Sequence, residues 1–279
     1  MKRCDLHTHS MFSDGSFAPE EIIDLAIKEG LSAVALCDHH AVDGLPRFLE
    51  KAKKENFEAV AGVEIAVKHK KTEFHLVALF IEERYFDKIS ALMEDLHRRK
   101  QRCNMDLVDR LNEAGYKIDY DHIVSLTPNG KINRVHIGAE LVEKGYFASI
   151  KEAIDKVLVE EAGFYKPPEK FDFFEILEFI KSIGASAVLA HPFRQATEKE
   201  LEELLPKAKA KGLDAIECYY SEFDEETTQK AIALAEKFGL KKSGGSDFHG
   251  DKKPEIKLGV GKGNLCVPYS CVQELRPDK

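Results

Sequence analysis

The stretch AVALCDHH at residues 33–40 and the stretch AVAGVE at residues 59–64 share one pattern. Each is a short apolar run that ends in side chains able to ligate a metal, Asp38-His39-His40 in the first and Glu64 in the second. Continuous apolar runs of this length are typical of strands that are buried on both faces of a parallel sheet. The two stretches therefore predict parallel strands with reactive side chains at their carboxyl ends.

Outward from these strands, apolar runs alternate with amphipathic helical patterns. Helices are predicted at residues 19–29 and 45–55, and the same rhythm returns at residues 173–244. Alternation of this kind indicates βα units. A chain of 279 residues is long enough for one barrel-sized domain. We therefore expect an α/β fold, a (βα) barrel with a largely parallel sheet.

The rhythm is interrupted between residues 85 and 164, where no buried strand is predicted. One long helical pattern reaches Gly115, shorter amphipathic segments follow it, and Pro167-Pro168 marks the end of the interruption. We expect a barrel domain made of residues 1–98 and 166–279, with a small all-helical insertion domain at 99–165.

Composition limits the classes of function. The formal net charge is −8, which argues against a broad surface for long duplex nucleic acid. The sequence has neither a long apolar run nor the apolar region of a signal peptide, so we expect a cytoplasmic protein without a membrane partner. The six cysteines show no CxxC pairing and are expected to be reduced thiols. The oligomeric state does not follow from the sequence.

Imidazoles and carboxylates recur at the predicted strand ends. In a parallel barrel these ends open onto one face, where active sites assemble. His7 and His9 are two residues apart at a strand end, so their side chains point to the same side. A buried Glu64 would be costly without a cation beside it. The candidate metal ligands are His7, His9, Asp14, His39, Glu64, His75, His191, Asp247 and His249.

Mixed imidazole and carboxylate ligands suit Zn²⁺, Mn²⁺ or Fe²⁺, and the sequence does not choose among these ions. We expect two or three divalent cations. Clustered cations lower the pKa of a bridging water, bind phosphate oxygens and stabilise a departing alkoxide. Hydrolysis at such a site requires no protein nucleophile.

Five short motifs stand out along the chain. They are HTHS with SDG at residues 7–15, CDHH at 37–40, GVE at 62–64, AHPFR at 190–194 and GGSDFHG at 244–250. Together with a His before an apolar strand, they resemble the PHP (polymerase and histidinol phosphatase) family over nearly the whole chain. The resemblance implies a distorted seven-stranded TIM-like barrel with a trinuclear metal site. It also implies hydrolysis of phosphate esters by a metal-bridging hydroxide, with inorganic phosphate as a product.

The resemblance also implies how the ligands are shared. One metal would be held by His7, His9, Glu64 and Asp247. Glu64 would bridge to a second, held also by His75 and His191, and a third would be held by Asp14, His39 and His249. Within this set we infer that Glu64, Asp247 and His191 are catalytic.

The helical insertion makes the chain similar to small, stand-alone members of the family. These hydrolyse the 3′-phosphate of nucleoside 3′,5′-bisphosphates or trim short RNA from its 5′ end. The resemblance therefore implies a small phosphorylated substrate, a nucleotide or a short 5′-phosphorylated oligoribonucleotide. One departure is that the family commonly shows DHD where this chain has Asp38-His39-His40. We expect Asp38 and His40 to support the ligands rather than to bind metal.

A phosphate that is not cleaved needs its own clamp, and the planar guanidinium of arginine suits this task. Arg194 follows the predicted strand end at His191. Arg134 and His136 begin a helix of the insertion, and helix starts favour anions. The family often shows GRPH there, of which this chain keeps the Arg and the His. We expect Arg134, His136 and Arg194 to bind substrate phosphate.

Three other functions stay open. A histidinol-phosphate phosphatase would use the same metal site, although the insertion fits the nucleotide-directed members better. An amidohydrolase-type C–N hydrolase typically carries a carboxylated lysine between two metals, where Glu64 stands in this chain. A non-catalytic, metal-stabilised PHP scaffold would be marked by lost ligands, and none is missing.

Overall fold

The computed structural model describes residues 2–126 and 132–277. The chain divides into two compact units, between Met93 and Glu94 and again between Lys170 and Phe171. These boundaries lie five residues before and five residues after those expected from the sequence. The first unit contains the strands and the second is helical.

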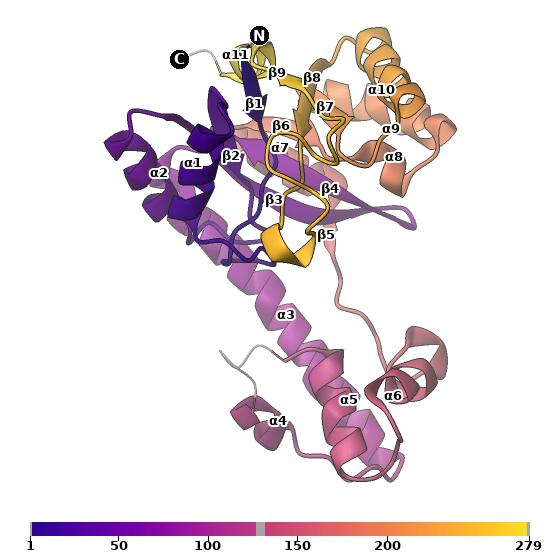
Figure 1. Ribbon diagram of the computed structural model, residues 1–279. Helices are drawn as coiled ribbons and strands as arrows, with labels where there is room; N and C mark the ends of the chain where they lie inside the picture. Colours follow the sequence, from indigo (N-terminus) through magenta and orange to yellow (C-terminus); the bar gives the residue numbers. More distant parts are fainter. Residues whose placement is uncertain (1, 127–131, 278–279) are drawn as a thin grey trace. The chain divides into compact units, whose positions relative to one another are not determined.

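The first unit alternates strands and helices along the chain (Figure 1). Its elements are β1 (Arg3–Asp5), α1 (Pro19–Lys28), β2 (Ala33–Leu36), α2 (Leu45–Lys54), β3 (Glu58–His69), β4 (Thr72–Leu79), β5 (Phe171–Asp172), α7 (Phe173–Ser182), β6 (Ser186–Leu189), α8 (Pro192–Gln195), α9 (Glu198–Ala210), β7 (Ala215–Tyr220), α10 (Glu225–Lys237), β8 (Lys241–Gly245), β9 (Val267–Pro268) and α11 (Ser270–Leu275). The α/β class predicted from the alternating pattern is confirmed.

The strands form one sheet in the order β8-β7-β6-β4-β3-β2-β1-β9, with β5 paired to β3. The sheet curls so that its far edge returns to β1, where the Leu6 amide donates to the Gly244 carbonyl at 3.0 Å. The isolated parallel bridge between Thr8 and Phe248 continues this contact. The result is a nearly closed barrel with β9 antiparallel to β1, which confirms the predicted TIM-like architecture.

Strand β4 departs from the predicted parallel order. It runs antiparallel to β3, with Ala66 opposite His75, and antiparallel to β6, with Leu76 opposite Leu189. A two-residue turn that includes Lys70, at φ 56°, links β3 to β4. His75 therefore does not reach the active face from the carboxyl end of a strand. It lies in the first half of a reversed strand, which brings it to the same face.

Helix ends follow local capping chemistry. The Asp172 side chain accepts from the Phe174 amide at 2.8 Å at the start of α7. At the start of α9, Thr197 and Glu200 form a capping box. Such caps satisfy amide groups that have no partner within the helix. Both helices lie within residues 173–244, where the sequence predicts alternating strands and helices.

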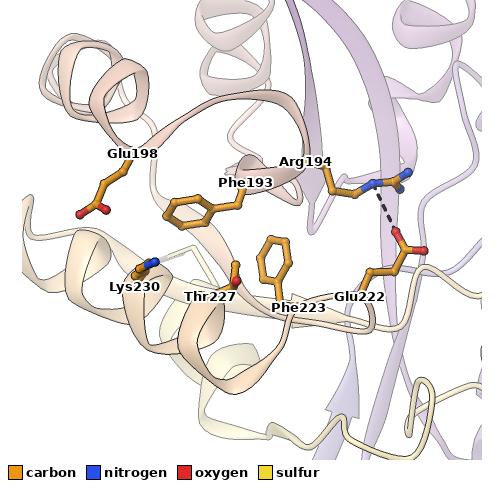
Figure 2. A pocket seen from close by; sticks show the side chains of 7 residues that line it. All are labelled: Phe193, Arg194, Glu198, Glu222, Phe223, Thr227 and Lys230. Carbon is orange, nitrogen blue, oxygen red and sulfur yellow. Dashed lines mark ion pairs between the residues drawn. The ribbon is translucent and has the colours of Figure 1, made fainter.

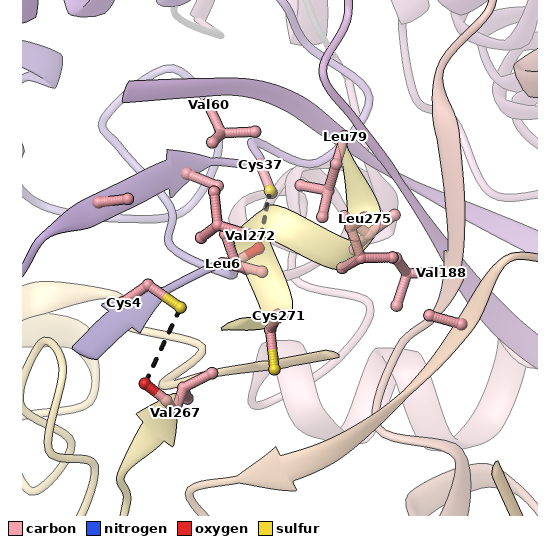
Figure 3. Packing of buried hydrophobic residues seen from close by; sticks show 14 of the residues in the cluster. Cys4, Leu6, Cys37, Val60, Leu79, Val188, Val267, Cys271, Val272 and Leu275 are labelled. Carbon is pink, nitrogen blue, oxygen red and sulfur yellow. Dashed lines mark hydrogen bonds between the residues drawn. The ribbon is translucent and has the colours of Figure 1, made fainter. Parts of the chain in front are cut away.

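One end of the barrel is closed by an apolar cluster (Figure 3). The short helix α11, which the sequence pattern did not predict, contributes Cys271, Val272 and Leu275. Their side chains pack with Leu6, which follows β1, and with Val188 of β6. All six cysteines are free thiols, and burial raises the pKa of Cys4, Cys37, Cys218 and Cys271.

The second unit has its own core. It comprises most of α3 (Phe86–Glu113) with α4 (Tyr120–Leu126), α5 (Arg134–Glu143) and α6 (Ile150–Val157), and no strand occurs among its described residues. Leu107, Leu111, Ile137 and Leu141 are buried in its apolar cluster. In the described part of the chain, no helix is long and apolar enough to cross a membrane.

Candidate metal centre

The carboxylate of Glu64, at the middle of β3, lies at the centre of the site and is fully buried. Its Oε2 atom lies 3.0 Å from His39 Nδ1, 3.2 Å from His7 Nε2 and 3.4 Å from His9 Nε2. His7 and His9 follow β1, and His39 follows β2. The ends of two adjacent strands, β1 and β2, therefore direct three imidazoles at one carboxylate oxygen of β3.

The other oxygen of Glu64 faces the opposite half of the barrel. Its Oε1 atom lies 2.7 Å from His75 Nδ1 and 3.1 Å from His191 Nε2. His75 comes from the reversed strand β4, and His191 follows β6. Both oxygens of one carboxylate thus meet imidazoles, and this is the arrangement of a bridging ligand.

Asp247, which follows β8, is a second buried carboxylate in the site. Its Oδ1 atom lies 3.1 Å from His9 Nε2 and 3.5 Å from His249 Nδ1. Its Oδ2 atom accepts from the Tyr220 hydroxyl and from Lys253 Nζ, each at 2.9 Å. Burial, together with the neighbouring Asp247 carboxylate, raises the pKa of Tyr220, so its hydroxyl stays a donor. One oxygen of Asp247 is held in place while the other faces the imidazoles.

Asp14 lies at the rim, with more than half of its side chain exposed. Its Oδ1 atom lies 3.2 Å from His249 Nε2, and its Oδ2 atom lies 3.8 Å from His39 Nε2. His9 Nδ1 is 3.9 Å from Asp14 Oδ1. Asp14 therefore forms an outer group with three imidazoles. The structure brings together all nine residues that the sequence nominated as ligands.

The buried atoms of the inner group suit a cation. His7 Nε2, both ring nitrogens of His9 and Glu64 Oε2 have no hydrogen bond of acceptable geometry. Buried polar atoms are normally satisfied. Ligand atoms bound to one ion at about 2.1 Å lie roughly 3.0–3.4 Å apart. Glu64 Oε2 lies 3.2 Å from His7 Nε2 and 3.4 Å from His9 Nε2. Among the described residues, His, Asp and Glu side chains form four overlapping groups of potential ligands. Within each group the ligand atoms lie within 4.8 Å of one another. The donor set therefore fits clustered divalent cations.

The pKa shifts of these side chains bear on the protonation states that bind metal. Burial raises the pKa of Glu64, but His7 and the other imidazoles outweigh it and hold that pKa well below its usual range. Burial lowers the pKa of His9 to about 4. Burial opposes protonation of His7, but Glu64 and Glu217 raise its pKa. Metal ligation needs ionised carboxylates and neutral imidazoles, and cations would take the place of the proton on His7.

Three residues at or beside the site have strained backbone conformations. His40, His191 and Asp247 have φ values of 52°, 30° and 56°, in the left-handed region that few non-glycine residues adopt. Each such residue costs about 1–3 kcal/mol and persists only where its surroundings hold it. The Asp247 amide donates to the His7 carbonyl at 2.9 Å. A Cβ at Gly245 would lie 2.3 Å from the His7 Cβ, so only glycine fits there.

Glu217, in β7, belongs to the site and was missed from the sequence. Its Oε1 atom lies 3.0 Å from His7 Nδ1, and its Oε2 atom accepts from the His191 amide at 2.8 Å. It is 2% exposed. With Nδ1 occupied in this way, His7 presents Nε2 to the centre. A lone Glu in an apolar strand was the available signal, since the burial argument used for Glu64 applies to it equally.

Asp5, the last residue of β1, was also missed. It is fully buried, and burial raises its pKa. Its carboxylate accepts from the Ser246 amide at 2.9 Å, the Ser246 hydroxyl at 2.5 Å and the Gly259 amide at 2.8 Å. Asp5 therefore fixes the residue before Asp247.

Asp38 and His40 accept hydrogen bonds from groups near the ligands, and the His40 ring stacks with the His39 ring at 6.4 Å between centroids. The Asp38 carboxylate accepts from the Ser10 amide at 2.7 Å and the Ser13 hydroxyl at 2.6 Å, which fixes the loop before Asp14. His40 Nε2 accepts from the Ala66 amide at 3.1 Å. Their supporting role stays a prediction.

The three expected phosphate-binding residues lie in different units. Arg194, on α8, donates from Nη1 to the Tyr220 hydroxyl at 2.8 Å and lies 4.0 Å from Asp247 Oδ2. Arg134, in the second unit, donates to the Leu158 carbonyl at 3.0 Å and lies over the Tyr165 ring. His136 Nδ1 accepts from the Asn133 amide at 3.2 Å at the start of α5. Arg194 therefore borders the centre, and the other two make these contacts within their own unit.

A barrel with buried imidazoles and carboxylates at these distances is typical of metal-dependent hydrolases. The sequence profile of the PHP domain matches residues 5–165, more than half of the chain, and the chain belongs to the PHP family. This confirms the resemblance drawn from the motifs. The protein is a metal-dependent phosphoesterase, a hydrolase of phosphate esters.

Two curated relatives cover most of the chain. A 5′-3′ exoribonuclease of Haemophilus influenzae is 30% identical over 89% of this chain and 90% of its own. A 3′,5′-nucleoside bisphosphate phosphatase of Chromobacterium violaceum is 28% identical over 89% of this chain and 88% of its own. Among solved structures, an amidohydrolase from C. violaceum with bound sulfate and no metal has a TM-score of 0.71 at 25% identity, covering 99% of this chain and 98% of that one.

Proposed function

We propose that the protein removes the 3′-phosphate of nucleoside 3′,5′-bisphosphates, cleaves short 5′-phosphorylated RNA, or does both, with two or three divalent cations in the cluster. One observation carries the metal-dependent chemistry. Both oxygens of the fully buried Glu64 carboxylate face imidazoles, three on one side and two on the other. The exoribonuclease and bisphosphate phosphatase relatives support the substrate class.

The side chains divide the work. Divalent cations in the cluster would supply the Lewis acidity and the activated water that phosphate-ester hydrolysis needs. Glu64, Asp247 and His191 would hold the cations where the ester is cleaved, with the six other nominated ligands around them. Glu217 keeps His7 and the His191 backbone in place, and Tyr220 with Lys253 restrains Asp247. Because these hydrogen bonds already hold the ligands in place, the site does not need to rearrange when substrate binds.

Arg194 is the proposed clamp for a phosphate oxygen at the centre. Its guanidinium borders Asp247, and its remaining contact with Glu222, at 3.3 Å from Nε, is partly exposed and can be exchanged for phosphate. Arg134 and His136 are the proposed clamp for the second, uncleaved phosphate. A substrate with two phosphates needs a clamp for the phosphate that is not cleaved, whereas a monophosphate does not.

An amidohydrolase activity is the second candidate, since the structural neighbour with bound sulfate carries that description. The bridging position argues against it. Glu64 stands between the imidazoles, while Lys253 contacts Asp247 Oδ2 at 2.9 Å. A carboxylated lysine would need to lie where Glu64 does.

A substrate panel tests the proposal. Purified protein is assayed with Mn²⁺, Zn²⁺ or Fe²⁺ on a nucleoside 3′,5′-bisphosphate, short 5′-phosphorylated RNA, histidinol phosphate, p-nitrophenyl phosphate and a simple amide. We expect the bisphosphate or the RNA to give the highest kcat/KM, with Glu64→Ala as the blank. A preference for histidinol phosphate or the amide would overturn the proposed substrate. No turnover of any ester would point to a scaffold.

A further inference from the structure

A cavity of about 430 Å³ lies in the first unit, beside the candidate metal centre. Figure 2 shows its walls, with Phe193 and Arg194 from α8, Phe223 before α10, and Lys230 on α10. Its volume lies within the range of roughly 300–1,000 Å³ that small-ligand pockets occupy. None of the residues nominated for metal binding lines it.

Arg194 joins this cavity to the centre. It lines the cavity, donates to the Tyr220 hydroxyl at 2.8 Å and lies 4.0 Å from Asp247 Oδ2. The Tyr220 hydroxyl in turn donates to Asp247 at 2.9 Å. Arg194 therefore lies between the metal centre and the cavity. A group attached to a phosphate at the centre reaches the cavity past this one side chain.

The lining suits a flat, neutral ring. The half-buried Phe193 ring and the buried Phe223 ring meet edge to face, with centroids 6.1 Å apart at 79°. Aromatic side chains are common stacking partners of nucleobases. The two cations of the lining already have carboxylate partners, Arg194 with Glu222 at 3.3 Å and Lys230 with Glu226 at 2.6 Å. Away from Arg194, the cavity is therefore better matched to a base than to another phosphate.

We propose that this cavity binds the base of the nucleotide that follows the scissile phosphate in short RNA, an inference that rests on the proposed function. In pApA, water's oxygen bonds to phosphorus and the bond from phosphorus to the 3′ oxygen breaks. The 3′ oxygen takes a proton, and the second nucleotide leaves with a 5′-phosphate. The base of that second nucleotide occupies the cavity.

A bisphosphate lacks the group that the cavity would bind. Adenosine 3′,5′-bisphosphate, pAp, is pApA without the second nucleoside, and its hydrolysis breaks the same phosphorus–oxygen bond. The cavity therefore separates two activities that share one metal centre. It would contribute to RNA cleavage and be empty during bisphosphate hydrolysis.

The test compares pApA with pAp for Phe193→Ala. We expect kcat/KM for pApA to fall about 5- to 100-fold, as expected for one lost stacking contact, while that for pAp changes less than about twofold. Phe193→Tyr keeps the ring and should retain activity on pApA. Phe174→Ala, a matched truncation of a half-buried phenylalanine on α7 outside the cavity, should affect neither substrate. A pApA analogue that lacks the second base should be insensitive to Phe193→Ala.

The outcomes separate this inference from the proposed function. If wild-type protein cleaves neither pAp nor pApA, the proposed function fails. If it cleaves pAp but not pApA, or if Phe193→Ala alters both equally or neither, the proposed function stands and the cavity is not a base subsite. Equal metal content in wild type and Phe193→Ala would show that a loss on pApA does not come from a disturbed His191.

Discussion

The two ends of the barrel are built from the same strands and have opposite character. Along β3, Val60 belongs to the apolar cluster, and four residues later Glu64 lies among imidazoles. Along β6, Val188 lies in the apolar cluster, and His191 follows that strand at the metal centre. On each strand, an apolar side chain whose burial drives folding lies only a few residues from a polar side chain that needs a ligand.

The difference has an energetic meaning. Each large aliphatic side chain buried at the apolar end contributes about 1.5–3 kcal/mol to folding. At the other end, three left-handed residues and several unsatisfied buried atoms oppose folding, at about 1–3 kcal/mol for each strained residue. The apolar end therefore stabilises the fold, and the polar end depends on that stability until cations bind. Variants at the two ends should fail in different ways.

The largest effect is expected for Glu64→Ala. Removal of the carboxylate that faces five imidazoles should lower metal content and reduce kcat/KM by about a thousandfold or more, since bound cations contribute several kcal/mol to transition-state stabilisation. Elemental analysis and phosphoesterase assays measure both effects. Glu50→Ala, an exposed carboxylate on α2, is the control. A Glu64→Ala protein that kept two or more metals, or a wild type fully active with one or none, would contradict the cluster.

Leu275→Ala tests the opposite end. Leu275 is fully buried, so the cavity left behind should lower the free energy of unfolding by about 2–5 kcal/mol. Urea denaturation measures this, and titration should find the metal stoichiometry unchanged. Ile27→Ala, at a side chain 41% exposed, should cost much less. Loss of metal binding in folded Leu275→Ala would show that the two ends are not separable.

Arg194→Ala and Arg134→Ala test the phosphate clamps. Each should cost about 1.5–3 kcal/mol on a nucleoside 3′,5′-bisphosphate, or roughly 10- to 150-fold in kcat/KM, because a charge-assisted contact is lost. The loss on p-nitrophenyl phosphate should be far smaller for Arg134→Ala, since that ester has one phosphate. Arg47→Ala, an exposed arginine paired with Glu20 on α1, should leave both rates unchanged. Equal losses on both esters for Arg134→Ala would show that Arg134 does not bind the second phosphate.

The smallest effect is expected for Glu217→Gln. A carboxamide cannot accept from both His7 Nδ1 and the His191 amide, because its NH₂ group replaces one acceptor. Loss of such a support typically costs 10- to 100-fold in metal affinity, and we expect about that loss in a metal titration of the apoprotein. The control is Glu222→Gln, which alters a partly exposed carboxylate that follows β7. Unchanged affinity would mean that Glu217 is structural only.

The sequence predicted the helices of the barrel closely because their signals are local. Asp172 caps α7, and Thr197 with Glu200 caps α9, and each cap lies within three residues of the groups that it satisfies. Most of the nine nominated ligands could be found because they are polar residues at the end of a predicted strand, although His75 lies inside one. Glu217 was missed because it lies inside an apolar run, with no terminal position to draw attention to it.

Residue types alone determined which chemistry is available. Buried imidazoles and carboxylates are costly unless they are paired or bind a cation, so their positions in the sequence already pointed to metals. Only the tertiary structure decided which atoms meet. Strand β4 is antiparallel, which places His75 beside Glu64, and the return of β8 to β1 places Asp247 beside His9. Strand direction and closure depend on contacts between distant residues, and local patterns do not specify such contacts.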